Sequence, residues 1–269
     1  LQAIKDGLKG KKYTTKDLST SYIINDEEDL SKVSDNTCWI FDQQDVLNIP
    51  MVQQLIMDPV LLNGVQNYLG CPPVHVQVNN WWSHNNSLDD ELALNRSAQQ
   101  YHQDKEFIKF VKVFIYLSDV EEENGPHQYI AGSHRDYLDH TSDDYQVSHR
   151  LTDEYLRSQY EDQRFQSFTG KKGTVIIEDT SGFHKGKPVI KGHRHILQLE
   201  FASSLYFNPV PCFSSENVQS EFKEFLQENA RFSLNYNHQS YQSHMKQRTT
   251  AHRKKYCKYL IKKILGKHP

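Results

Sequence analysis

Hydrophobic and polar residues alternate in the stretch "PVHVQVNNWW" at residues 73–82. Valines occupy positions 74, 76 and 78, and His75, Gln77 and Asn79 fill the positions between them. A period of two places the valines on one face of an extended chain, which predicts a half-buried β-strand. Further short apolar runs bounded by turn residues predict strands at residues 108–117, 127–131, 173–179 and 194–201.

Helical spacing occurs on both sides of these strands. In "DPVLLNGVQNYLG", the apolar positions recur at three- and four-residue intervals, and Gly70 is suited to end the helix. Residues 1–72 are predicted to be mostly helical, and "LTDEYLRSQY" at 151–160 predicts a short helix. Beyond residue 214 two further helix faces are predicted by the apolar sets Val218, Phe222, Phe225 and Leu226, and Cys257, Leu260, Ile261 and Ile264.

Short strands with glycine turns in the middle, and helices at both ends, predict a mainly β fold: a sandwich or barrel core braced by helices. We divide the chain into an N-terminal helical flank at residues 1–72, a core at 73–205 and a C-terminal helical extension at 206–269. The polar, tyrosine-rich stretch at 134–170 interrupts the core. It is either a lid over a binding site or a solvated excursion of the surface.

Composition narrows the class of protein. The chain has 269 residues, which suits one large domain, and its mean hydropathy of -0.74 indicates a very polar surface. None of the four cysteines has C-x-x-C spacing, which argues against a zinc site of paired cysteines and favours a reduced, cytoplasmic protein. No apolar run approaches the ~20 residues of a membrane span, and the first residues lack the apolar core of a signal peptide.

Charge is unevenly distributed. The net charge is -3, yet no Asp or Glu follows Glu228, whereas ten Lys or Arg residues do, so residues 1–228 carry -13. A basic tail can bind an anionic surface, or it can lie on the acidic body of its own protein, which we favour. Nucleic-acid binding is not expected, because it needs stacking aromatics or a groove as well as charge.

Three side chains suggest a metal site. His102 and Asp104 lie two residues apart just before a predicted strand, so they share one face, and His184 follows another predicted strand. Two imidazoles and one carboxylate form the facial triad of non-haem Fe(II) oxygenases, which leaves coordination positions open. Arg194, ten residues after His184, offers a planar fork for the carboxylate of an organic acid. The pair His-x-Asp alone is weak evidence for a metal site, but its combination with His184 and with Arg194 ten residues later is specific.

The same segments resemble a known family. "HQD" at 102–104, "FIYLSDVEEENGPHQYIAGSHR" at 114–135 and "FHKGKPVIKGHR" at 183–194 are similar to motifs of the phytanoyl-CoA hydroxylase family of Fe(II)- and 2-oxoglutarate-dependent dioxygenases, to which ectoine hydroxylase also belongs. The resemblance covers roughly residues 55–205. It implies a double-stranded β-helix, or jelly-roll, with the triad at one mouth of the barrel.

The resemblance also implies roles for individual residues. The cofactors would be Fe(II), 2-oxoglutarate as cosubstrate and O2, and iron would be bound by His102, Asp104 and His184. Arg194 would pair with the far carboxylate of 2-oxoglutarate. In this family polar residues of neighbouring strands also reach the cosubstrate, for which Gln77 and Lys112 are the candidates here. The alternative for Lys112 is a place on a solvated outward face.

The expected activity is hydroxylation of an unactivated C–H bond in a small metabolite, a glycan or a carrier-bound group, with release of succinate and CO2. Related halogenases lack the carboxylate ligand, so Asp104 favours hydroxylation. The same iron site could serve desaturation, cyclisation or epimerisation. An alternative of another class is a non-catalytic jelly-roll binding module, against which the intact triad and Arg194 argue.

Overall fold

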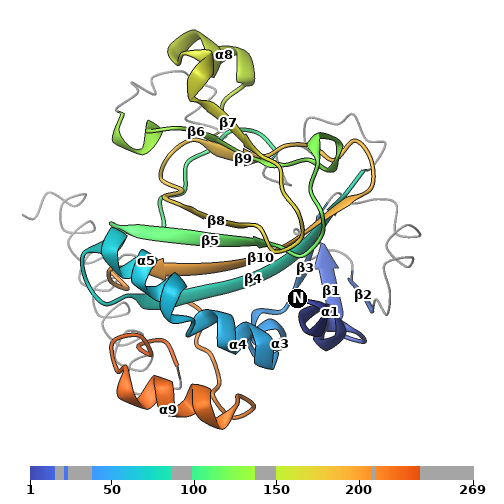
Figure 1. Ribbon diagram of the computed structural model, residues 1–269. Helices are drawn as coiled ribbons and strands as arrows, with labels where there is room; N and C mark the ends of the chain where they lie inside the picture. Colours follow the sequence, from blue (N-terminus) through green and yellow to red (C-terminus); the bar gives the residue numbers. More distant parts are fainter. Residues whose placement is uncertain (16–20, 24–37, 86–98, 137–149, 207–209, 237–269) are drawn as a thin grey trace, which may run out of the picture.

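A seven-stranded antiparallel sheet forms the larger layer of the molecule (Figure 1). The computed structural model describes residues 1–15, 21–23, 38–85, 99–136, 150–206 and 210–236. The strands of this sheet, in spatial order, are β2 (Ser21–Ile23), β1 (Lys12–Thr15), β3 (Cys38–Phe41), β4 (Val74–His84), β10 (His193–Ala202), β5 (Phe110–Tyr116) and β8 (Val175–Glu178).

A three-stranded sheet faces the larger one (Figure 1). Its antiparallel strands, in spatial order, are β7 (Phe165–Phe168), β6 (His127–Ile130) and β9 (His184–Gly186). The two facing sheets confirm the predicted mainly β, double-stranded β-helix fold. The 3-10 segment Glu122–Asn124 lies between β5 and β6 and so connects the two sheets, whereas the 3-10 segments Ser133–Arg135 and Asp162–Arg164 lie between β6 and β7.

Helices cover the outer face of the large sheet (Figure 1). They are α1 (Gln2–Leu8), α3 (Gln43–Leu47), α4 (Pro50–Ile56), α5 (Pro59–Leu69) and α9 (Ser220–Glu228). The ends of α5 follow from its sequence: the Asp58 carboxylate accepts the amides of Val60 and Leu61, Pro59 opens the first turn, and Gly70 ends the helix at φ 75°. The helix predicted from this apolar pattern is confirmed.

Side-chain alternation in β5 and β10 separates an apolar layer from the barrel interior. Val113, Ile115, Leu197 and Leu199 point toward the helices and join the largest hydrophobic cluster. The residues between them point into the barrel, where Phe114, Tyr116 and Ile196 form a smaller cluster and polar side chains continue the same row. The face of the large sheet that points into the barrel therefore carries polar groups beside packed apolar side chains.

The N-terminal flank contains strands that were not predicted, beside the predicted helices. Residues 1–72 supply β1, β2 and β3 as well as helices, and β3 pairs with β4 through Trp39 and Trp82. These strands have only three or four residues, too few to show a period of two in the sequence. The division into a flank, a core and an extension stays a prediction.

The predicted insertion at 134–170 is partly core. Its last part forms β7, which pairs with β6 from His127 to Ile130. Before it, α8 (Asp153–Gln159) packs on the small sheet through Leu156, and Lys185 Nζ lies 2.6 Å from Asp153 Oδ1.

Residues 137–149 and the basic tail at 237–269, including its predicted helix, lie outside the described residues. Among the residues described, no helix combines the length and apolar character needed to cross a bilayer.

Candidate metal centre and cosubstrate cavity

Backbone hydrogen bonds bring two distant segments together at one mouth of the barrel. The amide of His102 donates to the carbonyl of His184 and the amide of His184 donates back, each at 3.0 Å. Two residues on, the Asp104 amide donates to the Thr180 carbonyl at 2.8 Å. The His-x-Asp segment thus lies along the chain leading into β9, and the two imidazole rings stand 4.2 Å apart between centroids.

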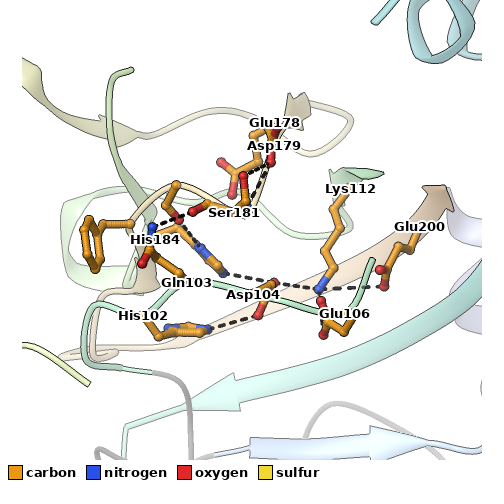
Figure 2. Close-up of polar contacts among 12 residues, drawn as sticks. His102, Gln103, Asp104, Glu106, Lys112, Glu178, Asp179, Ser181, His184 and Glu200 are labelled. Atoms are coloured by element: carbon orange, nitrogen blue, oxygen red, sulfur yellow. Dashed lines mark hydrogen bonds and ion pairs between the residues drawn. The ribbon is translucent and has the colours of Figure 1, made fainter. Parts of the chain in front are cut away.

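The structure brings the three predicted ligands together (Figure 2). His102 Nε2 lies 3.9 Å from Asp104 Oδ1, and His184 Nε2 lies 3.4 Å from Asp104 Oδ2. One ligand atom from each of the three residues falls within 4.8 Å of the others. Two imidazole nitrogens and one carboxylate oxygen at this spacing can converge on a single divalent ion and leave open positions.

Both imidazoles are oriented for metal binding. His102 Nδ1 lies 3.0 Å from the Gln100 carbonyl, and His184 Nδ1 lies 3.0 Å from the Gly182 carbonyl. A carbonyl only accepts, so each Nδ1 donates its proton to that carbonyl and each Nε2 faces Asp104. Burial, the largest cause, and the nearby His184 hold the pKa of His102 well below its ordinary value, which keeps that ring neutral. This arrangement fits an iron ion without rearrangement of the rings.

Lys112 lies inside the barrel, so its alternative placement on a solvated face is wrong. It is 6% exposed, and its Nζ lies 2.6 Å from Asp104 Oδ2, 3.5 Å from Glu106 and 3.7 Å from Glu200. Burial disfavours the charged amine, but these carboxylates outweigh it and raise its pKa. Burial would likewise raise the pKa of Asp104, but Lys112 and the imidazoles hold it well below its usual range. Both groups are therefore ionised.

Arg194 lies buried at the opposite end of the site. Its guanidinium donates to the Gly125 carbonyl and stands 3.4 Å from Ser83 Oγ, and its Nε has no partner in the described part of the chain. A Cβ at Gly186 would come within 2.5 Å of Arg194 Nη2, so only glycine leaves room for the guanidinium there. A buried cation held by neutral groups fits an incoming carboxylate.

A cavity of about 330 Å³ connects these groups. The triad, Arg194, Gln77 and Lys112 all line it, so the structure places every residue predicted for the site around one space. Gln77 projects from β4 on the same face as Asn79, as its alternation with the valines predicts. The roles of these residues in binding stay predictions.

Several residues of the site were not predicted. Glu106 lines the cavity, and Glu200 pairs with Lys112 across two neighbouring strands. His127 Nε2 lies 2.8 Å from Glu178 Oε1, and its ring stacks 5.8 Å from that of His184. The position of Glu200 could have been predicted from the sequence. In "RHILQLEF" it is separated from Arg194 and Gln198 by even numbers of residues, so the alternation of a strand places all three side chains on one face.

Similar solved structures include two proteins crystallised with 2-oxoglutarate. HygX from Streptomyces hygroscopicus, crystallised with nickel and 2-oxoglutarate, is 17% identical with a TM-score of 0.45, over 68% of this chain and 79% of its own. EctD from S. alaskensis, crystallised with 2-oxoglutarate and 5-hydroxyectoine, is 20% identical with a TM-score of 0.42, over 57% of this chain and 52% of its own. A comparison with curated protein sequences finds no match.

The family follows from the sequence match. The model of the phytanoyl-CoA dioxygenase (PhyH) family matches residues 27–195, which is more than half of the chain. The matched range contains the triad, Arg194 and all the residues that line the cavity except Ile196 and Gln198. The family resemblance drawn from the three motifs is thereby confirmed. The chain belongs to the phytanoyl-CoA dioxygenase family and is a 2-oxoglutarate-dependent dioxygenase, with iron and 2-oxoglutarate as its cofactors.

Proposed function

We propose that this dioxygenase hydroxylates an unactivated C–H bond of a small polar molecule. One oxygen atom of O2 enters the substrate, the other enters succinate, and 2-oxoglutarate loses CO2. The observation that carries the proposal is the convergence of His102, Asp104 and His184 on one point of a cavity whose far end holds the buried Arg194. Asp104 supplies the carboxylate ligand that halogenases of this type lack, which supports hydroxylation.

The chain's own residues orient the reactants. The Gln100 and Gly182 carbonyls fix the rings of His102 and His184, so that both Nε2 atoms would hold Fe(II) together with Asp104. Iron, when bound, supplies the activation of O2 that C–H oxidation requires. Lys112 occupies Asp104 Oδ2 at 2.6 Å, which leaves Oδ1 free to point at the ion. This contact favours one metal-binding oxygen over two.

Arg194 is the better of two candidates for holding the far carboxylate of 2-oxoglutarate. Among the described residues no carboxylate lies within ion-pair distance of Arg194, although it is only 3% exposed. Lys112, the other candidate, already has three carboxylates within 4 Å. A buried, uncompensated cation costs free energy until an anion joins it, so 2-oxoglutarate gains more from Arg194.

The test is an anaerobic titration of the protein with Fe(II) and 2-oxoglutarate. We expect a visible charge-transfer band that requires both, disappears with a chelator, and gives way to succinate when O2 is admitted. Exchange of Fe(II) for Zn(II) is the control, since zinc has no redox chemistry. A folded protein that binds Fe(II) but forms neither the band nor succinate would contradict the proposal.

Substitution of Gly186 by alanine should damage the site while the fold survives. The new Cβ would displace the end of the Arg194 side chain, because the two would otherwise be 2.5 Å apart. A displacement of about 1 Å in a positioning group can lower turnover by up to about 100-fold. Succinate formation measures the loss. Gly64→Ala is the matched control, since its Cβ would meet only Ile177 Cδ1 at 3.8 Å; equal activity of both variants would show that Arg194 does not need this space.

A further inference from the structure

Three consecutive backbone carbonyls accept hydrogen bonds from the segments that carry the metal ligands. The carbonyls belong to Thr180, Ser181 and Gly182. In this order they accept the amide of Asp104 at 2.8 Å, Nε2 of Gln103 at 2.7 Å and Nδ1 of His184 at 3.0 Å. Each donor belongs to a predicted ligand or to its direct neighbour in the sequence. The position of this short stretch of backbone therefore sets the position of the ligands.

The stretch is a turn that Asp179 holds in shape. The Gly182 amide donates to the Asp179 carbonyl at 3.1 Å, which closes the turn. Oδ1 of the Asp179 carboxylate accepts the amide of Ser181 at 2.9 Å and its hydroxyl at 2.5 Å (Figure 2). Aspartate favours such turns because its side chain can bond the backbone two residues further on. The conformation of residues 179–182 therefore depends on this carboxylate.

Two tyrosines from other elements fix Asp179 in place. The hydroxyl of Tyr68, near the C-terminal end of α5, donates to Oδ2 of the carboxylate, and the Tyr129 hydroxyl in β6 donates to the Asp179 carbonyl at 3.0 Å. Burial raises the pKa of Tyr68 and the bond to Asp179 raises it further, so this hydroxyl keeps the proton that it donates. Helix α5 lies on the outer face of the large sheet (Figure 1). A helix outside the barrel thus contacts the turn beside the metal ligands.

Gln103 connects the turn to the His-x-Asp segment. It stands between His102 and Asp104, and alternation along an extended chain turns its side chain away from the face that the two ligands share. Figure 2 shows this side chain beside Ser181, whose carbonyl it meets at 2.7 Å. Gln103 does not belong to the described lining of the cavity. Its amide therefore acts on the segment that carries the ligands and not on a molecule bound in the cavity.

Ordered ligands favour metal binding. Three side chains that the protein already holds in place bring their ligand atoms within 4.8 Å of one another. An ion that had to order these side chains itself would lose binding free energy to their conformational entropy. Hydrogen bonds to the groups around the ligands remove that cost, which is why such supporting groups tune metal affinity.

We propose that Tyr68, Asp179 and Gln103 are positioning residues of the iron site, because they fix the turn whose carbonyls orient the metal ligands. The proposal rests on the proposed function, since it takes the triad as the ligands of Fe(II). None of the three belongs to the described lining of the cavity. They therefore raise the affinity for iron without touching iron, cosubstrate or substrate, and the N-terminal flank contributes to the site through Tyr68.

Three variants remove these bonds. Tyr68→Phe loses only the hydroxyl, Gln103→Met keeps the length of the side chain without its donor, and Asp179→Ala removes the carboxylate. Anaerobic calorimetry of the metal-free proteins with Fe(II) measures binding independently of turnover. We expect the Kd for Fe(II) to rise about 10- to 100-fold, the usual range for groups that orient metal ligands, and to rise most in Asp179→Ala, which loses the bonds to both the turn and α5.

Two matched variants separate positioning from a general loss of stability. Tyr236→Phe removes a tyrosine hydroxyl that lies 2.6 Å from His75 Nδ1 in the core. Gln166→Met removes a glutamine amide that donates to a backbone carbonyl at 2.8 Å on the surface. We expect both to bind Fe(II) like the parent, even where circular dichroism shows a lower melting temperature. An equal loss of Fe(II) affinity in these controls would show general destabilisation and overturn the proposal.

Tyr68→Phe and Gln103→Met decide the outcome if Asp179→Ala fails to fold. Parental affinity for Fe(II) in folded Tyr68→Phe or in folded Gln103→Met overturns the proposal for that residue. A parent protein that binds no Fe(II), or forms no charge-transfer band with 2-oxoglutarate, contradicts the proposed function and this proposal with it. If the parent forms the band and the variants bind Fe(II) as tightly as it does, the proposed function stands and only the positioning is wrong.

Discussion

Replacing Asp104 with alanine should abolish succinate formation and weaken Fe(II) binding by more than about 100-fold, the upper range for loss of a residue that only supports a ligand. Asp104 is the anionic member of the triad, and its oxygens lie 3.9 Å from His102 Nε2 and 3.4 Å from His184 Nε2. The two imidazoles alone leave a divalent ion without a negative ligand. Fe(II) titration and succinate assays of the purified variant measure both effects.

The fold should survive this change. Lys112 loses one carboxylate but keeps Glu106 at 3.5 Å and Glu200 at 3.7 Å, so no uncompensated charge is left buried. Circular dichroism checks this expectation, and Asp104→Asn serves as a second variant that retains an acceptor for Lys112. Asp119→Ala is the control, since that exposed carboxylate pairs with Lys171 away from the cavity. Normal turnover by well-folded Asp104→Ala would remove Asp104 from the metal site.

The parts of the site that the sequence predicts depend on local spacing. His102 and Asp104 are two residues apart, and Arg194 opens a strand whose alternation places it in the interior with Gln198. Such relations are fixed by the geometry of an extended chain. His184 is different, because its approach to His102 requires two segments far apart in sequence to pair. Its prediction rested on ligand chemistry and on the family resemblance.

The parts that the sequence left open depend on register between distant strands. Lys112 stands beside Glu200 because β5 pairs with β10 in one particular register, and a shift of one residue would turn Lys112 to the outer face. From the sequence alone, a lysine in an apolar strand could therefore lie either inside the barrel or on the solvated outer face. The contact between Lys112 and Glu200 could not be predicted before this pairing was known, nor could the role of β7 at the end of the insertion.

Replacing Arg194 with alanine should weaken 2-oxoglutarate binding by about 2–5 kcal/mol, the usual cost of losing one partner of a buried, hydrogen-bonded charge pair. Arg194 is 3% exposed, and the Gly125 carbonyl and Ser83 hold its guanidinium at one end of the cavity. Its buried position removes competition from water, so the ion pair with the carboxylate is strong. Anaerobic titration of the charge-transfer band with 2-oxoglutarate gives the affinity.

Arg194→Lys should weaken 2-oxoglutarate binding less than Arg194→Ala does, because the charge is kept while the planar fork is lost. Iron affinity should be the same in both variants and in the parent, since Arg194 lies outside the cluster of His102, Asp104 and His184. Parental affinity for 2-oxoglutarate in Arg194→Ala would move the anchor to Lys112. That outcome would require Lys112 to exchange one of its three carboxylates for the cosubstrate.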